Sequence, residues 1–83
     1  MSMQIHVFDT HVMTVSGEYI HFDVLVNNEN IKEVEQYAKQ YLDSLGVKVD
    51  NIKQSRCNFC HSELANLEVQ ESVASQGYSI MRL

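Results

Sequence analysis

The sequence predicts an α+β domain in the order β-β-α-β-α-β, with a largely antiparallel sheet and two helices packed on one face of it. Three observations support this fold class. Two strand-like segments near the N-terminus flank a glycine, an amphipathic helical pattern follows them, and the second half is again strand-like, helical and strand-like. The chain has 83 residues and neither a repeat nor an internal linker, so residues 1–83 are expected to form a single domain.

The first two strands are predicted to form a hairpin, Met3–Val15 with Glu18–Val26. Side chains alternate along both segments as they do in half-buried strands. Gly17 can supply the positive φ angle of a tight turn between them. One face of the hairpin is expected to be apolar, and the other is expected to carry His6, His21 and Asp23. The alternation is strongest in the second segment, where Ile20, Phe22, Val24 and Val26 oppose Tyr19, His21, Asp23 and Leu25.

A first helix is predicted over Ile31–Leu45, because apolar residues recur there at three- and four-residue steps. Asn28 or Asn30 is expected to cap its start through a side-chain oxygen. Gly46 follows its end, where a left-handed residue is common.

The second half of the chain is predicted to contain three further elements. A third strand runs from Val47 toward Ser55, and a second helix runs from about Leu64 to near Gly77. The segment YSIMRL, residues 78–83, is expected to form the last strand.

Composition argues against several classes of function. Six basic residues against eleven acidic ones give a net charge of −5, so nucleic-acid binding is not expected. No run approaches the roughly 18 apolar residues that a membrane span needs. The N-terminal segment has neither a basic stretch nor an apolar block. No secretory signal is therefore predicted, and the protein is expected to be cytoplasmic.

The stretch SRCNFCHSE, residues 55–63, holds both cysteines of the chain. Cys57 and Cys60 have the C-x-x-C spacing at which two thiolates can bind one ion, and His61 follows directly. Zinc prefers tetrahedral sulfur and nitrogen ligands. These three residues are therefore candidate zinc ligands, and His21 or His6 would complete the set if the stretch folds over the hairpin. The pattern is half of a zinc motif, since the chain has no second C-x-x-C.

Three other interpretations of this stretch stay open. Cys57 and Cys60 could be a thiol–disulfide redox pair, since a following helix stabilises a thiolate at its N-terminus. The string CNFCH also matches c-type haem attachment, which requires export and is disfavoured without a signal peptide. Finally, the cysteines could simply pack as small hydrophobic residues at a strand-to-helix corner that Ser62 caps.

His21 and Asp23 form a further candidate pair, because side chains at i and i+2 of a strand point to the same side. A carboxylate can set the tautomer of a neighbouring imidazole in a general base or a metal site. A polar pair on the solvent face of a hairpin is commoner, and it is the interpretation favoured here. Asp9-Thr10 is expected to mark a bend or a bulge.

Several stretches together resemble a bacterial family of small proteins, the domain of unknown function DUF2024. They are IHVFDT at residues 5–10, HFDV at 21–24, CNFCHSE at 57–63 and GYSI at 77–80, so the resemblance runs nearly end to end. It implies a compact α/β domain and no particular activity. The motif positions that it singles out are His6, Asp9, His21, Asp23, Cys57, Cys60, His61 and Ser62.

The function predicted from these residues is a non-catalytic binding or interaction module with a candidate zinc site at the CxxCH stretch. The alternative is a thiol–disulfide redox protein that uses Cys57 and Cys60, the only residues to which catalysis is assigned. A homodimer is also predicted, because pairing adds buried area that a small domain lacks. It is expected to form through a second sheet face that carries Phe8, Leu25 and Tyr19, or through the edge of the last strand.

Overall fold

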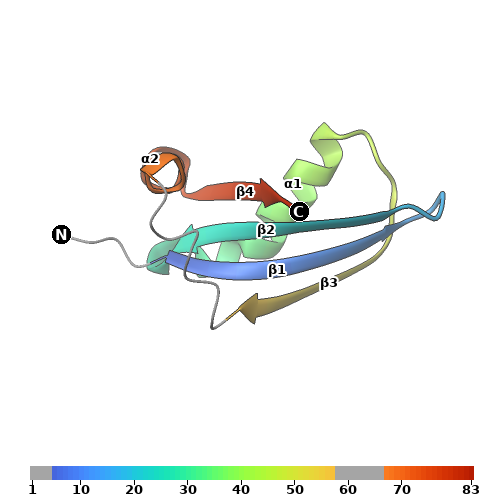
Figure 1. Cartoon of the computed structure of the whole chain (residues 1–83), viewed down its shortest axis with the longest axis horizontal. Helices are drawn as coiled ribbons and strands as arrows, with labels where there is room; N and C mark the ends of the chain where they lie inside the picture. Colours follow the sequence, from blue (N-terminus) through green and yellow to red (C-terminus); the bar gives the residue numbers. More distant parts are fainter. Residues whose placement is uncertain (1–4, 58–66) are drawn as a thin grey trace.

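The computed structural model describes residues 5–57 and 67–83 of the chain. Within them lie a four-stranded sheet, two α-helices and a 3-10 helix (Figure 1). This arrangement confirms the predicted α+β class and the predicted order of the elements. In chain order they are β1 (Ile5–Thr14), β2 (Tyr19–Asn27), η1 (Asn28–Glu33), α1 (Val34–Ser44), β3 (Val49–Cys57), α2 (Leu67–Gln76) and β4 (Tyr78–Arg82).

The sheet has the strand order β3-β1-β2-β4, and all neighbouring strands are antiparallel. The predicted hairpin is its centre, with β1 paired to β2 from Ile5 opposite Asn27 to Met13 opposite Tyr19. At the turn, the backbone N–H of Gly17 donates to the carbonyl of Thr14 at 3.0 Å. The hairpin therefore fixes which residue of β1 lies opposite which residue of β2.

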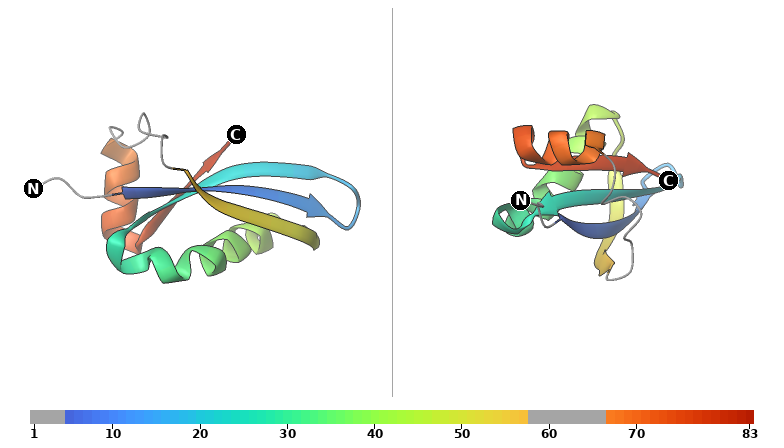
Figure 2. Two further views of the ribbon diagram at one scale, coloured as in Figure 1. Left: turned by 90° about the horizontal axis from the view of Figure 1, so that it is seen from below. Right: turned by 60° about the vertical axis from the view of Figure 1, so that its left-hand side comes forward.

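The main hydrophobic core lies between this hairpin and α1, which runs along one face of the sheet (Figure 2). Phe22 of β2 is fully buried there, and its ring meets the ring of Tyr41 edge-on at a centroid distance of 4.8 Å. Alternate residues of β2 reach this core, as the sequence pattern predicted. Its buried members are Val12, Ile20, Phe22, Val24, Val26, Ala38 and Leu42.

A second, smaller core lies on the opposite face, at the end of the sheet where β1 begins, and α2 packs against it. The sequence predicted both helices on one face, whereas α1 and α2 pack against side chains of opposite faces. The physical reason is that β1 starts with apolar side chains in both alternation sets, so each face needs its own cover. The members of this core are Ile5, Val7, Leu25, Val69 and Val73, with Met81 packed against them.

Two of the predicted face assignments are corrected by this arrangement. His6 lies opposite Val26 and therefore on the α1 face, not beside His21. Phe8 also packs on the α1 side, and Leu25 is fully buried against α2. The sheet face proposed for a homodimer thus loses two of its three residues. β4 lies at an edge of the sheet, so dimerisation through that edge stays a prediction.

The helical segment after the hairpin begins differently from the prediction. Asn27, rather than Asn28 or Asn30, is the cap: its side-chain oxygen accepts a hydrogen bond from the backbone N–H of Asn30 at 3.1 Å. The first residues form η1, so the α-helix begins at Val34 instead of Ile31. Gly46 follows its end at a φ angle of +72°, as predicted.

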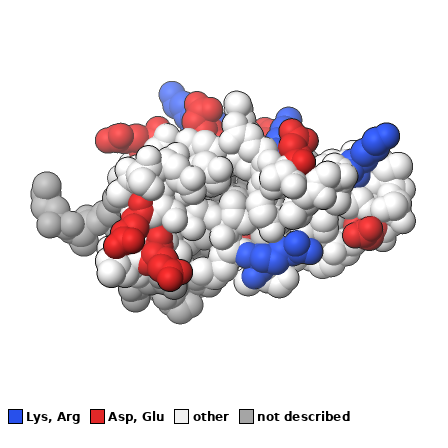
Figure 3. Space-filling model, turned by 90° about the horizontal axis from the view of Figure 1, so that it is seen from above, with Lys and Arg blue, Asp and Glu red and all other residues white. Residues whose placement is uncertain are grey.

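Acidic and basic side chains both occur on the face of the molecule drawn in Figure 3. Figure 3 shows acidic and basic side chains in small separate groups on one face of the molecule. None of the helices in residues 5–57 and 67–83 is long and apolar enough to cross a membrane.

Gly77 and Gly17 form a matched pair for testing the packing between α2 and η1. Both have φ angles near +90°, a conformation that strains any other residue by about 1–2 kcal/mol. A methyl group at Gly77 would also meet Asn30 Nδ2 and Tyr37 Oη at 3.1 Å, whereas one at Gly17 meets nothing within 4 Å. We expect Gly77→Ala to lower the free energy of unfolding in urea by more than Gly17→Ala does. Equal losses would contradict the close contact at Gly77.

Candidate metal centre

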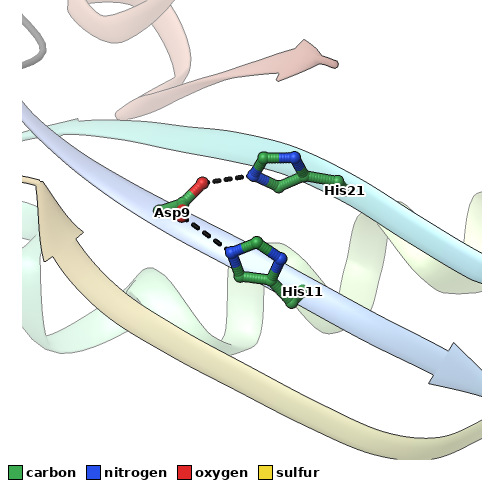
Figure 4. A group of neighbouring side chains, drawn as sticks. All are labelled: Asp9, His11 and His21. Carbon is green, nitrogen blue, oxygen red and sulfur yellow. Dashed lines mark hydrogen bonds and ion pairs between the residues drawn. The ribbon is translucent and has the colours of Figure 1, made fainter.

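Three polar side chains converge on the sheet face opposite α1 (Figure 4). Asp9 and His11 project from β1, and His21 projects from β2. Nε2 of His11 lies 2.8 Å from Oδ2 of Asp9, and Nε2 of His21 contacts Oδ1 of the same carboxylate. One ligand atom from each residue lies within 4.8 Å of the other two. A single carboxylate therefore bridges two imidazoles.

Two features of the hairpin bring these residues together: the alternation of side chains along each strand and the register between the strands. Asp9 and His11 stand two positions apart on β1, so their side chains share a face. His11 lies directly opposite His21 in the register. The two imidazole rings stack with a centroid distance of 4.1 Å and an angle of 14° between their planes. All three residues are held by paired strands, and sites on such elements are positioned more accurately than sites on loops.

Tyr19 extends the cluster toward the hairpin turn. Its hydroxyl contacts Nδ1 of His11, and the two rings stack at a centroid distance of 5.9 Å. Both ring nitrogens of His11 therefore have a polar partner. A tyrosine hydroxyl can donate or accept a hydrogen bond, so Tyr19 can serve either tautomer of the imidazole.

The protonation of the cluster follows from the Asp9 carboxylate. Partial burial raises the pKa of the Asp9 carboxyl, but hydrogen bonds from His21 and His11, together with their charge, outweigh it and hold the pKa below its ordinary value of 3.8. An ionised carboxylate only accepts hydrogen bonds, so Nε2 of His11 and Nε2 of His21 are the donors. In neutral His11, Nδ1 then accepts from the hydroxyl of Tyr19.

The donor set of two imidazole nitrogens and one carboxylate oxygen suits a divalent transition metal. Zinc, in particular, binds histidine nitrogen and aspartate oxygen, and catalytic zinc sites use three protein ligands and an open position. The side chains of His11, Asp9 and His21 are 39%, 31% and 29% exposed, so an ion can reach them from solvent. The group could hold a metal ion.

Replacing Asp9 with asparagine should change stability in a pH-dependent way when metal is removed with a chelator. A lowered carboxyl pKa stabilises the folded state above the pKa of the unfolded chain, and this stabilisation is lost as pH falls through the folded-state pKa. We therefore expect the wild type to have the higher Tm at pH 7, and the difference to shrink as pH falls below 3.8. Thermal melts followed by circular dichroism measure it, with Asp50→Asn on exposed β3 as the control. A difference that stays constant with pH would contradict the assigned hydrogen bonds.

Of the site residues that the sequence predicted, His6 and His21 lie on opposite faces of the sheet. His6 contacts Asn28 through Nε2 and Arg56 through Nδ1, on the other face from His21. The backbone of Cys57 ends β3 and lies opposite Val7. Cys60, His61 and Ser62 lie outside the described residues.

Two other expectations for the hairpin concern Asp23 and Asp9-Thr10. His21 hydrogen-bonds Asp9, and Asp23 lies opposite Asp9 in the register and is almost fully buried. The pair weighed from sequence was His21 with Asp23, and the structure shows Asp9 as a hydrogen-bond partner of His21. The bend or bulge expected at Asp9-Thr10 is wrong, since β1 is regular there and its irregularity falls between Met13 and Thr14.

His11 is the site residue that the sequence reasoning missed. Its spacing of two from Asp9 was a usable signal, since it places both side chains on one face of a strand. The facing position of His21 depends on the hairpin register, which the pattern of β1 leaves open.

The comparisons with known proteins bear on the family and on nothing finer. Neither a curated protein nor a solved structure matches the chain. The model of one family, described as a domain of unknown function, DUF2024, matches residues 3–83, which is nearly the whole chain. The resemblance noted in the sequence is therefore confirmed, and the chain belongs to the DUF2024 family.

Proposed function

We propose that this protein is a small metal-binding module that holds one divalent transition-metal ion, with zinc preferred, at Asp9, His11 and His21. The observation that supports it is the convergence of two imidazole nitrogens and a carboxylate oxygen within 4.8 Å on paired strands. Residues predicted from sequence as ligands enter this site only through His21, so the proposed centre differs from the CxxCH stretch.

The spacing of the ligand atoms supports zinc without a large rearrangement. Zinc binds nitrogen and oxygen at about 2.0–2.2 Å, so two ligand atoms of a tetrahedral site lie about 3.3 Å apart. Nε2 of His11 and Oδ2 of Asp9 are 2.8 Å apart when they hydrogen-bond directly. An ion that replaces the proton between them needs this distance to widen by only about half an ångström.

Tyr19 supplies the partner that a metal-bound His11 needs. When the ion takes Nε2, the proton of the neutral ring moves to Nδ1, and the tyrosine oxygen then accepts from it. Such partners of the second ring nitrogen fix the tautomer and the orientation of metal-bound histidines. The same hydroxyl thus serves the metal-free and the metal-bound ring.

A cobalt titration of chelator-treated protein tests the proposal. Co²⁺ replaces zinc in such sites and has a visible spectrum that reports its ligands. We expect one equivalent of Co²⁺ to bind with the weak visible bands of nitrogen and oxygen ligands, and added Zn²⁺ to abolish them. The doubly substituted Cys57→Ser, Cys60→Ser protein should give the same spectrum. No cobalt spectrum in the wild type would contradict the proposal.

The metal site predicted at Cys57, Cys60 and His61 remains a separate proposal, and the same titration examines it. Thiolate ligands add an intense near-ultraviolet charge-transfer band to a Co²⁺ spectrum. If that band appears in the wild type and disappears in the cysteine variant, the ion binds to the CxxCH stretch instead. The redox alternative predicts alkylation of a thiol by iodoacetamide well below the ordinary thiol pKa of about 8.5.

A further inference from the structure

We infer that the metal held by Asp9, His11 and His21 keeps an open coordination position and binds a small oxyanion there, such as phosphate or a carboxylate, with Lys53 as the neighbouring cation. This inference rests on the proposed function and deepens it. It concerns what the metal centre binds, whereas the proposal above concerns whether the centre binds a metal.

The open position follows from the ligand count and from exposure. Among the side chains in residues 5–56 and 67–83, the group contains three ligands, and tetrahedral zinc takes four. Structural zinc sites are closed by protein, whereas sites with three protein ligands admit water or another molecule. Between 29% and 39% of each ligand side chain is exposed, so a small molecule can approach the ion.

Lys53 of β3 places a positive charge at the edge of the metal site, which we call the rim. It lies directly opposite His11 in the register and shares its face of the sheet. Directly opposed residues have Cβ atoms about 4.5–5.5 Å apart, so the long side chain of Lys53 can reach across the His11 ring. It makes no ion pair with an acidic residue in the described part of the chain. Ser55, opposite Asp9, adds a hydroxyl to the same rim.

The charges of the loaded site favour an anion. A divalent ion with the Asp9 carboxylate and two neutral imidazoles has a net charge of +1, and Lys53 raises it to +2. Asp23 lies opposite Asp9 on the neighbouring strand, and if its carboxylate is ionised the net charge of the site falls to +1. The sign stays positive in both cases, although the whole chain has a net charge of −5.

The surface beside the site suits a small ligand rather than a large one. A shallow hollow of about 180 Å³ adjoins the site at His11, the one metal ligand that lines it, and its other lining residues include Tyr19, Lys53, Met13 and Asn51. Sites for drug-sized ligands are commonly about 300–1,000 Å³ and more enclosed. A phosphate group or a carboxylate, either free or at the exposed end of a longer molecule, fits this description.

Anion titrations of the cobalt-loaded protein test the inference. Inorganic phosphate and acetate are added separately, and the visible spectrum is followed. We expect at least one of them to change the bands with saturation at millimolar concentration, while one equivalent of cobalt stays bound. Lys53→Met should weaken that binding about fivefold, the upper range for an exposed ion pair. Lys39→Met, on α1 at the opposite face, should leave it unchanged.

The outcomes separate the two levels of the argument. If the cobalt spectrum forms but neither anion changes it, the oxyanion inference is overturned and the metal site stands. Loss of the spectrum on adding anion means that the anion strips the metal, which also overturns the inference. If wild type and Lys53→Met bind the anion equally well, the role of Lys53 as the neighbouring cation is overturned. If no cobalt spectrum forms at all, the proposed function fails, and this inference fails with it.

Discussion

Replacing His21 with alanine is expected to lower the affinity of the protein for Co²⁺ or Zn²⁺ by about a hundredfold. Zinc-finger peptides bind zinc with roughly 10–16 kcal/mol, which over their four ligands is about 3 kcal/mol for each, and we take this value for one histidine ligand. A loss of that size corresponds to about two decades in Kd. Nε2 of His21 contacts Asp9 directly, so the variant removes a ligand and leaves its neighbours in place. Competition with a chromogenic chelator measures the change.

The matched control is His6→Gln. His6 lies on the α1 face, where it contacts Asn28 and Arg56. We expect this variant to keep the wild-type metal affinity, provided that its circular dichroism spectrum shows a folded protein. If His6→Gln weakened binding as much as His21→Ala, the proposed centre would be misplaced.

The second large effect concerns folding. Leu25→Asp is expected to unfold the domain at room temperature, because Leu25 is fully buried in the small core between the sheet and α2. An unpaired carboxylate in such a place costs several kcal/mol, in addition to the lost apolar packing. Small domains have only about 5–15 kcal/mol of stability in total. Urea denaturation followed by circular dichroism measures the loss.

Val15→Asp is the control for this variant. Val15 lies at the hairpin turn and is 66% exposed, so a charge there keeps its hydration. We expect it to change the free energy of unfolding by less than about 0.5 kcal/mol. If Leu25→Asp instead stayed folded and light scattering gave half the mass of a dimeric wild type, the result would contradict the burial of Leu25 against α2. It would support the homodimer face that the sequence predicts.

Much of the fold could be predicted from the sequence because the local signals agree with one another. The alternation of β2 from Ile20 to Val26 identifies the face that packs on α1, since every second residue from Ile20 lies in that core. The helical pattern before Gly46 is also clear, because Ala38 and Leu42 stand one turn apart on the buried side.

The faces of β1 could not be predicted in the same way. Ile5 and Val7 pack toward α2, while Phe8 packs toward α1, so apolar residues occur in both alternation sets. Alternation locates a buried face only when the other face is polar. This ambiguity led to the placement of His6 beside His21 and of both helices on one face.

The candidate site depended on the same missing information. A shift of one residue in strand pairing moves every side chain of the shifted strand to the other face. With Ser16 and Gly17 as a two-residue turn, His11 would face Phe22 rather than His21. The observed turn spans residues 15–17, and Met13 pairs with Tyr19. Only this register stacks His11 on His21 and places both beside Asp9.

The sequence predicts a zinc site at Cys57, Cys60 and His61 because both cysteines lie in one short stretch. Compact spacing is a strong signal in sequence, because it needs no knowledge of the fold. A site assembled from two strands has no such spacing. Asp9 and His21 are 12 positions apart, and a hairpin must form before they meet.

The most direct test of the metal centre is nuclear magnetic resonance of the histidine side-chain nitrogens in ¹⁵N-labelled protein, recorded before and after one equivalent of Zn²⁺. Long-range ¹H–¹⁵N spectra report the state of each ring nitrogen separately. The proposed centre predicts that the Nε2 signals of His11 and His21 move to the range of metal-bound nitrogen and that Nδ1 of His11 becomes protonated, while the His6 signals stay in place. Unchanged His11 and His21 signals, with zinc bound elsewhere or not bound, would contradict it.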